Sequence, residues 1–350
     1  MGTGEDIVTT PRDVTRKLDR LAAEVRAAHA DGTINGAERR HIVADAKNAT
    51  RGAESLLPRE GDPVVRELNH LRALATTGRL GVHADDETRA LIREKNALWQ
   101  HAQHDAHTDP LAHLRHFQRP FHGVATRDFT WHGHAVHVVA VDLGNPHVKL
   151  QTTSPGERGQ HVEDFVKSHH AEVGINADFF TFGSYKPSGV AVHAGKSWGG
   201  KADGFEDGLV FRGRHAEIRP RMGHVPEWAN NVVSARHLVV ENGRAISEHD
   251  LLRRNPVSSE RDKVREVKPR TSVGLSKDSR VLYLFAGMNM NEHTMGKLMA
   301  EHGVHLGFDM DSGGSAELVR RRHGRTRVLQ DGYGQGEHRR VANAILVQSD

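Results

Sequence analysis

The chain has 350 residues, 37% of them hydrophobic, which is enough for a substantial core and suits two domains or one large one. Its 48 basic and 45 acidic residues give a net charge of only +3, and the two signs are interspersed. The sequence therefore has no basic stripe of the kind that indicates nucleic-acid binding. It contains no cysteine, which excludes disulfides and thiolate chemistry.

The N-terminal residues 1–10 lack the basic and apolar regions of a secretory leader. No stretch of the sequence approaches the roughly 18 consecutive apolar residues that a membrane helix needs. We therefore expect no membrane insertion, and a location that is either cytoplasmic or reached by an export route that uses no such leader.

Histidine is unusually frequent, with 27 residues, many of them between His101 and His137. The pairs His101/His104 and His113/His116 have the spacing of one helical face, which metal sites use, but no His-Glu-x-x-His pattern accompanies them. A polar surface on which histidine replaces lysine or glutamine explains these residues as well, so both interpretations stay open.

The first third of the chain has the apolar spacing of amphipathic helices. Each predicted helix begins at a capping or first-turn signal: Thr10-Pro11, Asn35 with Glu38, Asp62-Pro63, and Asp86-Glu87. The helices form either a small bundle of their own or a cover for the domain that follows, and the pattern does not separate the two. This region, residues 1–118, has no catalytic constellation, and docking of a partner is a candidate role for it.

From residue 119 onward the pattern changes to strands. Two β-hairpins are predicted, 129–131 with 135–141 and 271–276 with 281–286. Other predicted strands are 171–176, 189–192, 209–212, 238–240 and 341–347, and the predicted helices are 162–169 and 294–302, the latter capped by Thr294. Many strands with few helices predict an α/β (α+β) domain with a mixed sheet over residues 119–350, preceded by the all-α segment.

Two groups of polar residues lie at predicted strand ends. Asn176 and Asp178 are two positions apart, so both project from one face, although capping of a turn explains them equally. Arg270 follows a proline at the entrance of a strand, where a guanidinium can present its fork to a phosphate or a carboxylate. An ordinary surface arginine is the alternative.

A third group begins with Asp309 and Asp311. The two residues are two positions apart in an extended segment, so their side chains face the same way. Two neighbouring carboxylates raise the pKa of one of them, which makes acid and base roles available near neutral pH. Gly313 and Gly314 follow, and glycines let backbone N–H groups approach an anion closely, although any tight loop uses such a pair.

Together these residues resemble the phosphodiester glycosidase family, in four stretches that occur in the family's order between about residue 124 and the C-terminus. The family's Asn-Gly-Gly-Phe-Phe, Pro-Arg-Thr-x-x-Gly, Asp-Gly-Gly-Gly-Ser and Arg-x-Val-x-Asn-Ala stretches correspond to Asn176-Ala177-Asp178-Phe179-Phe180, Pro269-Arg270-Thr271-Ser272-Val273-Gly274, Asp311-Ser312-Gly313-Gly314-Ser315 and Arg339-Arg340-Val341-Ala342-Asn343-Ala344. The resemblance includes family members associated with bacterial and phage exopolysaccharides.

The chain also departs from the family's pattern. Asp178 stands where the family usually has glycine, Ser312 replaces the first loop glycine, and Asp309 stands where asparagine is more usual. Ala316-Glu317 replaces small hydroxyl residues. These changes are consistent with a reaction that has been retuned to another substrate or has been lost.

The resemblance implies a hydrolase that cleaves a sugar from a sugar-1-phosphodiester at the anomeric carbon. Such a reaction needs a carboxylate beside an oxocarbenium-like transition state, for which Asp311 is the first candidate. Cations and N–H donors would bind the phosphate, while amide and carboxylate side chains would bind sugar hydroxyls or orient water. The candidate catalytic residues are Asp311, Arg270, Asp178 and Asn176, and the candidate substrate-binding residues are Thr271, Asp309, Gly313, Gly314, Ser315 and Arg339.

Two other functions fit the same residues. A phosphodiesterase that acts at phosphorus would hold a divalent metal with Asp178, Asp309 and Asp311, and a divalent cation is the one cofactor that the sequence brings forward. A non-catalytic module that binds a glycan or a protein partner is the other. The expected partner is a sugar phosphodiester or a phosphate-linked glycan, with no nucleic acid.

Overall fold

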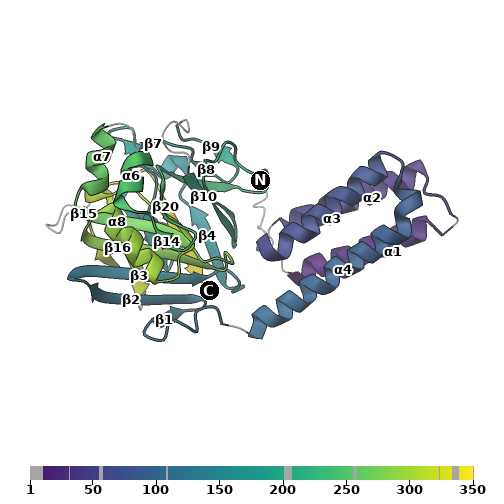
Figure 1. The fold of residues 1–350 in the computed structure, drawn as a ribbon, viewed down its shortest axis with the longest axis horizontal. Helices are drawn as coiled ribbons and strands as arrows, with labels where there is room; N and C mark the ends of the chain where they lie inside the picture. Colours follow the sequence, from purple (N-terminus) through teal and green to yellow (C-terminus); the bar gives the residue numbers. More distant parts are fainter. Residues whose placement is uncertain are drawn as a thin grey trace. The chain divides into compact units, whose positions relative to one another are not determined.

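The computed structural model describes residues 11–30, 32–54, 58–107, 109–200, 207–254, 258–322, 324–332 and 339–349. The chain divides into two compact units, Met1–Asp109 and Pro110–Asp350, which are described separately (Figure 1). In the part of the chain that is described, no helix combines the length and the apolar character needed to cross a membrane.

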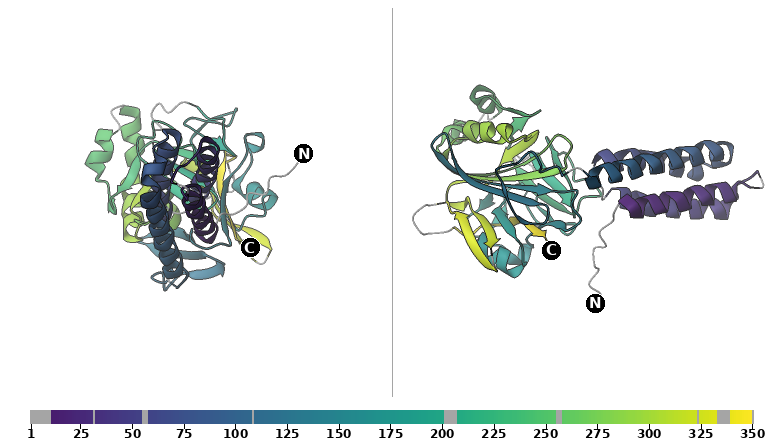
Figure 2. Two further views of the ribbon diagram at one scale, coloured as in Figure 1. Left: turned by 90° about the vertical axis from the view of Figure 1, so that its right-hand side faces the viewer. Right: turned by 90° about the horizontal axis from the view of Figure 1, so that it is seen from below.

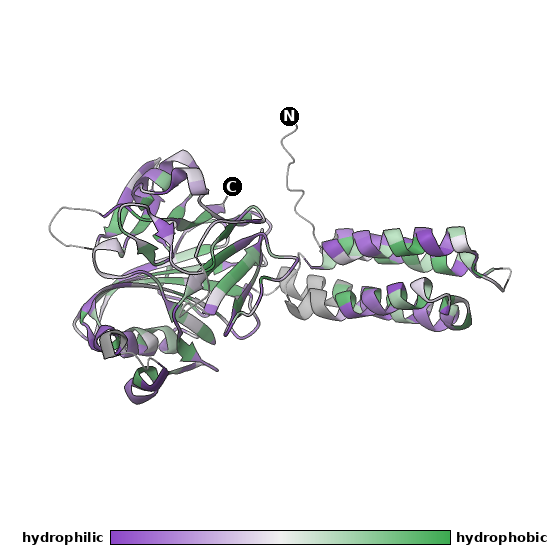
Figure 3. Ribbon diagram, turned by 90° about the horizontal axis from the view of Figure 1, so that it is seen from above, coloured by the Kyte–Doolittle hydropathy of each residue, from purple (hydrophilic) through white to green (hydrophobic). Residues whose placement is uncertain are grey.

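Four helices make up the described part of the N-terminal unit: α1 (Pro11–Ala28), α2 (Gly36–Ala53), α3 (Pro58–Thr76) and α4 (Leu80–His107). Each helix packs against the next, and α4 packs back against α1, so the helices close into a four-helix bundle (Figure 2). Hydrophobic and hydrophilic residues alternate along the ribbons of these helices (Figure 3). The apolar stripes meet in a core that includes Val14, Leu18, Leu68 and Leu91. The helices therefore form a bundle of their own.

The capping signal at Asn35 is confirmed. Its side chain accepts hydrogen bonds from the amides of Ala37 and Glu38, and the Glu38 carboxylate accepts one from the Asn35 amide. The predicted cap Thr10 lies outside the described residues.

The predicted starts of the other two helices are wrong, because both helices begin earlier. In α3, Pro58 opens the helix and Pro63 lies inside it. The turn before α4 is made by Gly78, whose φ of +75° ends α3, so that α4 starts at Leu80.

The structure tests one of the two predicted histidine pairs. The side chains of His101 and His104 lie outside the described residues. His113 and His116 lie in consecutive turns, stabilised by hydrogen bonds from the Leu114 amide to the Leu111 carbonyl and from the Phe117 amide to the Leu114 carbonyl. The prediction that this second pair shares a helical face is therefore wrong.

The C-terminal unit contains three larger sheets, in which every described strand pair is antiparallel. In spatial order, the first holds β1 (Gln118–Phe121), β2 (Val124–Trp131), β3 (His134–Asp142), β16 (Val281–Met290), β15 (Lys268–Leu275), β17 (Leu306–Asp309), β13 (Leu238–Glu241) and β14 (Arg244–Ala245). The second holds β19 (Arg325–Gln330), β18 (Leu318–Arg322), β5 (Val173–Asn176), β20 (Ala344–Ser349) and β4 (Val148–Thr152). The third holds β11 (His215–Arg219), β10 (Asp207–Arg212), β12 (Asn231–Ala235), β8 (Val192–His193) and β9 (Lys196–Ser197).

Short elements complete this unit. The strands β6 (Phe180–Thr181) and β7 (Lys186–Pro187) form a small ribbon, and the helices are α5 (Val162–Ser168), α6 (Glu248–Arg254), α7 (Ser258–Arg265), α8 (Glu292–Glu301) and the 3₁₀ turns Pro155–Glu157 and Gly313–Ser315. Helix α8 packs on the first sheet and α5 on the second. The predicted class, a helical segment followed by a strand-rich α+β unit with few helices, is confirmed. The sheets are antiparallel where a mixed sheet was expected.

Both predicted hairpins are confirmed, as β2 with β3 and as β15 with β16. The first turns at His132 and Gly133, whose φ values of +45° and +85° suit a two-residue hairpin turn. Three details were predicted wrongly. Of residues 189–192 only the last belongs to a strand, the strand predicted from 341 begins at Ala344, and the cap of α8 is Asn291, whose side chain accepts a hydrogen bond from the Thr294 amide.

Strand ends from all three sheets meet at one place. β17 ends beside the start of β15, with Ser272 paired to Asp309, and β5 ends beside the start of β20, with Asn176 paired to Ala344. The end of β12 approaches the same place, since the Ser234 hydroxyl donates a hydrogen bond to Asp178 just beyond β5. Polar residues at these strand ends therefore form one group.

Candidate active site

Asn176, fully buried at the end of β5, joins three segments of the chain. Its side-chain N–H donates to the Asp311 carbonyl at 2.7 Å, and its oxygen accepts from the Thr271 hydroxyl at 2.8 Å and the Glu317 amide at 2.9 Å. The Thr271 hydroxyl also lies 3.1 Å from the Asp311 carbonyl. Asn176 and Thr271 therefore fix the backbone at Asp311.

Asp178 lies beside this backbone and is 1% exposed. One carboxylate oxygen accepts hydrogen bonds from the amide and hydroxyl of Ser234, at 2.7 and 2.8 Å, and the other accepts from the Asn343 side chain. Burial raises the pKa of Asp178 to about 7, against these hydrogen bonds, and the nearby charge of Asp311 raises it further. The acids that interact here are thus Asp178 and Asp311.

Asp311 follows β17 and is half-buried. Burial raises its pKa to about 6, while the Ser315 hydroxyl, the Ser312 amide and the charges of Arg339 and Lys268 oppose the rise. The Ser312 amide donates to the Asp311 carboxylate at 3.0 Å. Asp311 therefore changes charge near neutral pH while remaining accessible.

Two glycines shape the loop after Asp311, one within it and one packed against it. Gly313 has a φ of +68°, which L side chains rarely adopt. Gly332 packs directly on this loop, and a Cβ at that position would lie 2.1 Å from the Gly313 carbonyl oxygen. The loop that carries Gly313, Gly314 and Ser315 is thus closely packed against a second backbone segment, which fixes its path next to Asp311.

Arg270 is 1% exposed, and the protein itself binds its guanidinium. Its Nε donates to the Met290 carbonyl, one terminal nitrogen donates to the carbonyls of Lys263 and Glu266, all at 2.9 Å, and the other binds Asp309. The fork was expected to face a phosphate or a carboxylate, and one of its nitrogens does bind the Asp309 carboxylate, while no nitrogen is left for a phosphate. The geometry instead uses its donors to connect four protein segments.

The Asp309 carboxylate has a second hydrogen-bond partner. Besides Arg270 it accepts a hydrogen bond from the Ser272 hydroxyl at 2.7 Å. Glu292 lies 3.6 Å from Arg270, and the His237 ring nitrogen lies 2.7 Å from Glu292. We call Arg270, Asp309, Glu292 and His237 the buried charge network.

Opposite charges compensate the two acids of this network to different degrees, since burial still raises the pKa of Asp309 against the charge of Arg270. Burial alone would raise the pKa of Glu292, but its hydrogen bond with His237 and the charges of His237, Arg270 and Arg236 outweigh burial and lower it. Asp309 and Asp311, which were expected to act as a pair, therefore have different partners: Asp309 belongs to the buried charge network, and Asp311 interacts with Asp178.

Three cations lie near Asp311. The positive charges of Lys268 and Arg339 lower the pKa of Asp311. Arg236 also interacts with the charge of Asp311: burial lowers the pKa of Arg236, and the charges of the surrounding acids, Asp311 among them, only partly offset this. The guanidinium carbon of Arg236 lies 4.7 Å from the centre of the Phe179 ring, and that of Arg339 lies 4.9 Å from the centre of the Phe182 ring. Aromatic residues of the segment after β5 thus hold two of the cations.

Sequence reasoning missed four of these residues as members of the site. Ser234 comes from β12, a strand that was not predicted, and Arg236 follows directly after that strand, so no local signal pointed to either residue. Asn343 lies in one of the four matched stretches, so the resemblance could have identified it, whereas Lys268 stands just outside another of them, two positions before Arg270.

The aspartates do not converge on one point as ligands of a metal ion would. In the part of the chain that is described, the one group of three or more metal-binding side chains whose ligand atoms all lie within 4.8 Å of one another is Glu24, His41 and Asp45, in the helical unit. The side chains of Asp178 and Asp309 are held by protein donors instead.

Comparison with known proteins gives a consistent result. The family model for phosphodiester glycosidase matches residues 169–348. The fold is similar to that of the zebrafish N-acetylglucosamine-1-phosphodiester alpha-N-acetylglucosaminidase catalytic domain, auto-inhibited by its pro-peptide, with 16% identity, a TM-score of 0.51, and 65% of this chain and 82% of that chain covered. A hypothetical protein from Synechocystis is similar at 13% identity and a TM-score of 0.50, over 65% of this chain and 62% of that one. No curated protein matches the sequence.

Proposed function

Since the chain belongs to the phosphodiester glycosidase family, we propose that it hydrolyses a sugar-1-phosphodiester at the anomeric carbon, with Asp311 as the carboxylate beside that carbon. The substrate class is a phosphate-linked sugar or glycan, including one within an exopolysaccharide. The similarity to the zebrafish domain supports the fold on which this activity is proposed.

One observation carries the proposal: Asp311 is the half-buried acid of the site, has a pKa of about 6, and has cations around it. A glycosidic transition state develops positive charge at the anomeric carbon, and a carboxylate placed there stabilises or attacks it. Asn176 and Thr271 bind the backbone carbonyl of Asp311, which leaves its carboxylate to the substrate. We assign both of them a positioning role.

The cations divide between two roles in this proposal. Lys268, Arg339 and Arg236 bind the phosphodiester oxygens, because they lie around Asp311. Arg270 acts as a positioning residue, because its guanidinium is bound by Asp309 and by backbone carbonyls.

The reaction then proceeds as follows. The bond between the anomeric carbon and the phosphate oxygen breaks, and the phosphate leaves as a phosphomonoester whose negative charge the cations stabilise. A water oxygen forms the new bond to the anomeric carbon and releases a proton. Because a phosphate is already a good leaving group, the site needs charge stabilisation more than a strong general acid.

A panel of sugar-1-phosphodiesters tests the proposal, with mass spectrometry to detect the free sugar and the phosphomonoester. We expect turnover of at least one substrate by the full chain, and turnover lower by on the order of 10³-fold or more in the Asp311→Asn variant. Binding of the panel without turnover would support the non-catalytic module instead. Turnover that stops in chelator and returns with a divalent cation would support the metal-dependent phosphodiesterase.

A further inference from the structure

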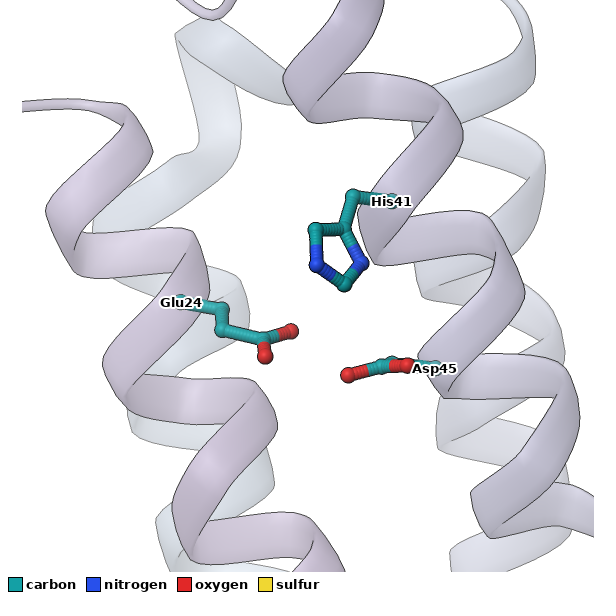
Figure 4. A group of neighbouring side chains, drawn as sticks. All are labelled: Glu24, His41 and Asp45. Atoms are coloured by element: carbon teal, nitrogen blue, oxygen red, sulfur yellow. The ribbon is translucent and has the colours of Figure 1, made fainter.

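Three metal-binding side chains meet on the helical unit, far along the sequence from the candidate active site. Glu24 lies on α1, and His41 and Asp45 lie one turn apart on one face of α2. Figure 4 shows the three side chains pointing toward one another across the two helices. Their ligand atoms all lie within 4.8 Å of one another.

A second observation points to a ligand at this place. The Oε2 atom of Glu24 is buried, and within the described residues no group donates a hydrogen bond to it. Its Oε1 atom accepts a hydrogen bond from Arg20 at 3.1 Å. A buried carboxylate oxygen without a donor is unfavourable, and a bound cation is one of the few things that satisfies it.

From these observations we propose that Glu24, His41 and Asp45 form a zinc site that joins α1 to α2. One imidazole nitrogen and two carboxylate oxygens are ligands that zinc accepts, and three protein ligands leave a fourth position for water. Magnesium and calcium prefer oxygen ligands alone, so the histidine favours zinc. The site is separate from the proposed hydrolytic site and does not depend on it.

The geometry requires only small side-chain movements. Ligands at about 2.0 to 2.2 Å from a tetrahedral zinc ion lie roughly 3.5 Å apart, so the ligand atoms must approach one another by at most about 1.3 Å. His41 is exposed, and Glu24 and Asp45 are half-buried at the bundle surface, so rotamer changes suffice.

Arg20 competes with the metal for the same oxygens. Its guanidinium binds Glu24 and lies 3.5 Å from Asp45, and its side chain is 69% exposed. In the absence of zinc, Arg20 partly neutralises the two carboxylates. Zinc replaces it, and the exposed arginine moves into solvent at little cost.

Zinc titration of the full chain, freed of metal by a chelator, tests the site. We expect one site that binds more tightly than the background from the other histidines, and a higher unfolding temperature for the helical unit with zinc. His41→Ala should weaken this site by at least about 100-fold, since it removes a direct ligand. Arg20→Ala should tighten it several-fold, because the competing cation is gone.

His83→Ala is the matched control, because His83 also lies at the surface of a bundle helix, on α4. It should leave the tight site unchanged. Cobalt substitution adds a spectroscopic readout: the absorption of a four-coordinate site should be present in the wild type and the control and absent in His41→Ala. Equal zinc affinity in the wild type and His41→Ala, or equal loss in both histidine variants, would mean that zinc binds adventitiously and would overturn the proposal.

Discussion

Two regions of the C-terminal unit contain the same types of charged residue and use them differently. In the buried charge network, Asp309 binds Arg270 and Glu292 binds His237, so each acid has a base within contact distance. Asp311, two residues after Asp309 in the chain, interacts with a second acid, Asp178, and with cations. Burial raises the pKa of Asp309 as well as that of Asp311, but the Asp309 carboxylate is bound by Arg270 and Ser272, whereas Asp311 is more exposed and lies among cations. The first region therefore supports the fold and the second contains the proposed chemistry.

The largest effect is expected for Asp311→Asn. The variant keeps the shape and one oxygen acceptor for the Ser312 amide but removes the charge. We expect turnover to fall by on the order of 10³-fold or more, and the unfolding temperature to be unchanged or raised at neutral pH, because a charge that burial disfavours is removed. Turnover rates and thermal unfolding of the two proteins test this. Near wild-type turnover would show that another residue provides the carboxylate.

Arg270→Lys should lower the stability of the C-terminal unit, whereas Asp311→Asn lowers turnover. Lysine keeps the charge but cannot reach Asp309 and the carbonyls of Lys263, Glu266 and Met290 at the same time. We expect a loss of about 2 to 4 kcal/mol in the free energy of unfolding. Denaturant unfolding measures this loss. A variant with unchanged stability and lost turnover would return Arg270 to the role of phosphate ligand.

The pH dependence of stability should show whether Asp178 keeps its proton in the folded protein. Its pKa in the folded protein is about 7, above the ordinary value of 3.8, so between these pH values the folded state keeps a proton that the unfolded state has lost. The free energy of unfolding therefore falls as pH rises from about 4 to about 7, by up to about 4 kcal/mol from this group. Asp178→Asn should remove that part of the slope.

Comparing the wild type with Asp178→Asn at several pH values gives the contribution of Asp178 together with its interaction with Asp311. The carboxyl of Glu87 in the helical unit, whose pKa burial raises to about 7, contributes equally to both proteins and cancels. Parallel stability curves would mean that Asp178 stays ionised in the folded protein.

The smallest predicted effect concerns Lys268. Turnover should rise with pH as Asp311 loses its proton, with a midpoint near its pKa of about 6. Because the charge of Lys268 lowers that pKa, Lys268→Met should move the midpoint upward, by less than about one pH unit for a partly solvated charge. The exposed Lys277 gives a control variant, Lys277→Met, whose midpoint should not move. A midpoint that falls in Lys268→Met would contradict the arrangement of charges around Asp311.

Local patterns predicted much of the fold. The four-helix unit follows from apolar periodicity and from signals such as Asn35 with Glu38, and the hairpins follow from strands joined by short turns. Helix starts were less predictable: Pro58 and Pro63 both suit a first turn, and the sequence alone does not say which of them opens α3.

The site was predictable only in part. Asn176, Asp178 and Asp311 were identified from the sequence, and hydrogen bonds and charge link them in the structure. The use of Arg270 was not predictable, because its partners come from α7, the end of β16 and β17, which the sequence does not bring together. Arg236 was missed because β12 has no distinct strand signal.

Hydrolysis in water labelled with oxygen-18 tests the central claim most directly, because it reports which bond breaks. Cleavage at the anomeric carbon forms a new bond between that carbon and the oxygen of water. We therefore predict that the label appears in the released sugar and that the phosphomonoester contains none. Label in the phosphomonoester would mean attack at phosphorus and would contradict the proposed glycosidase.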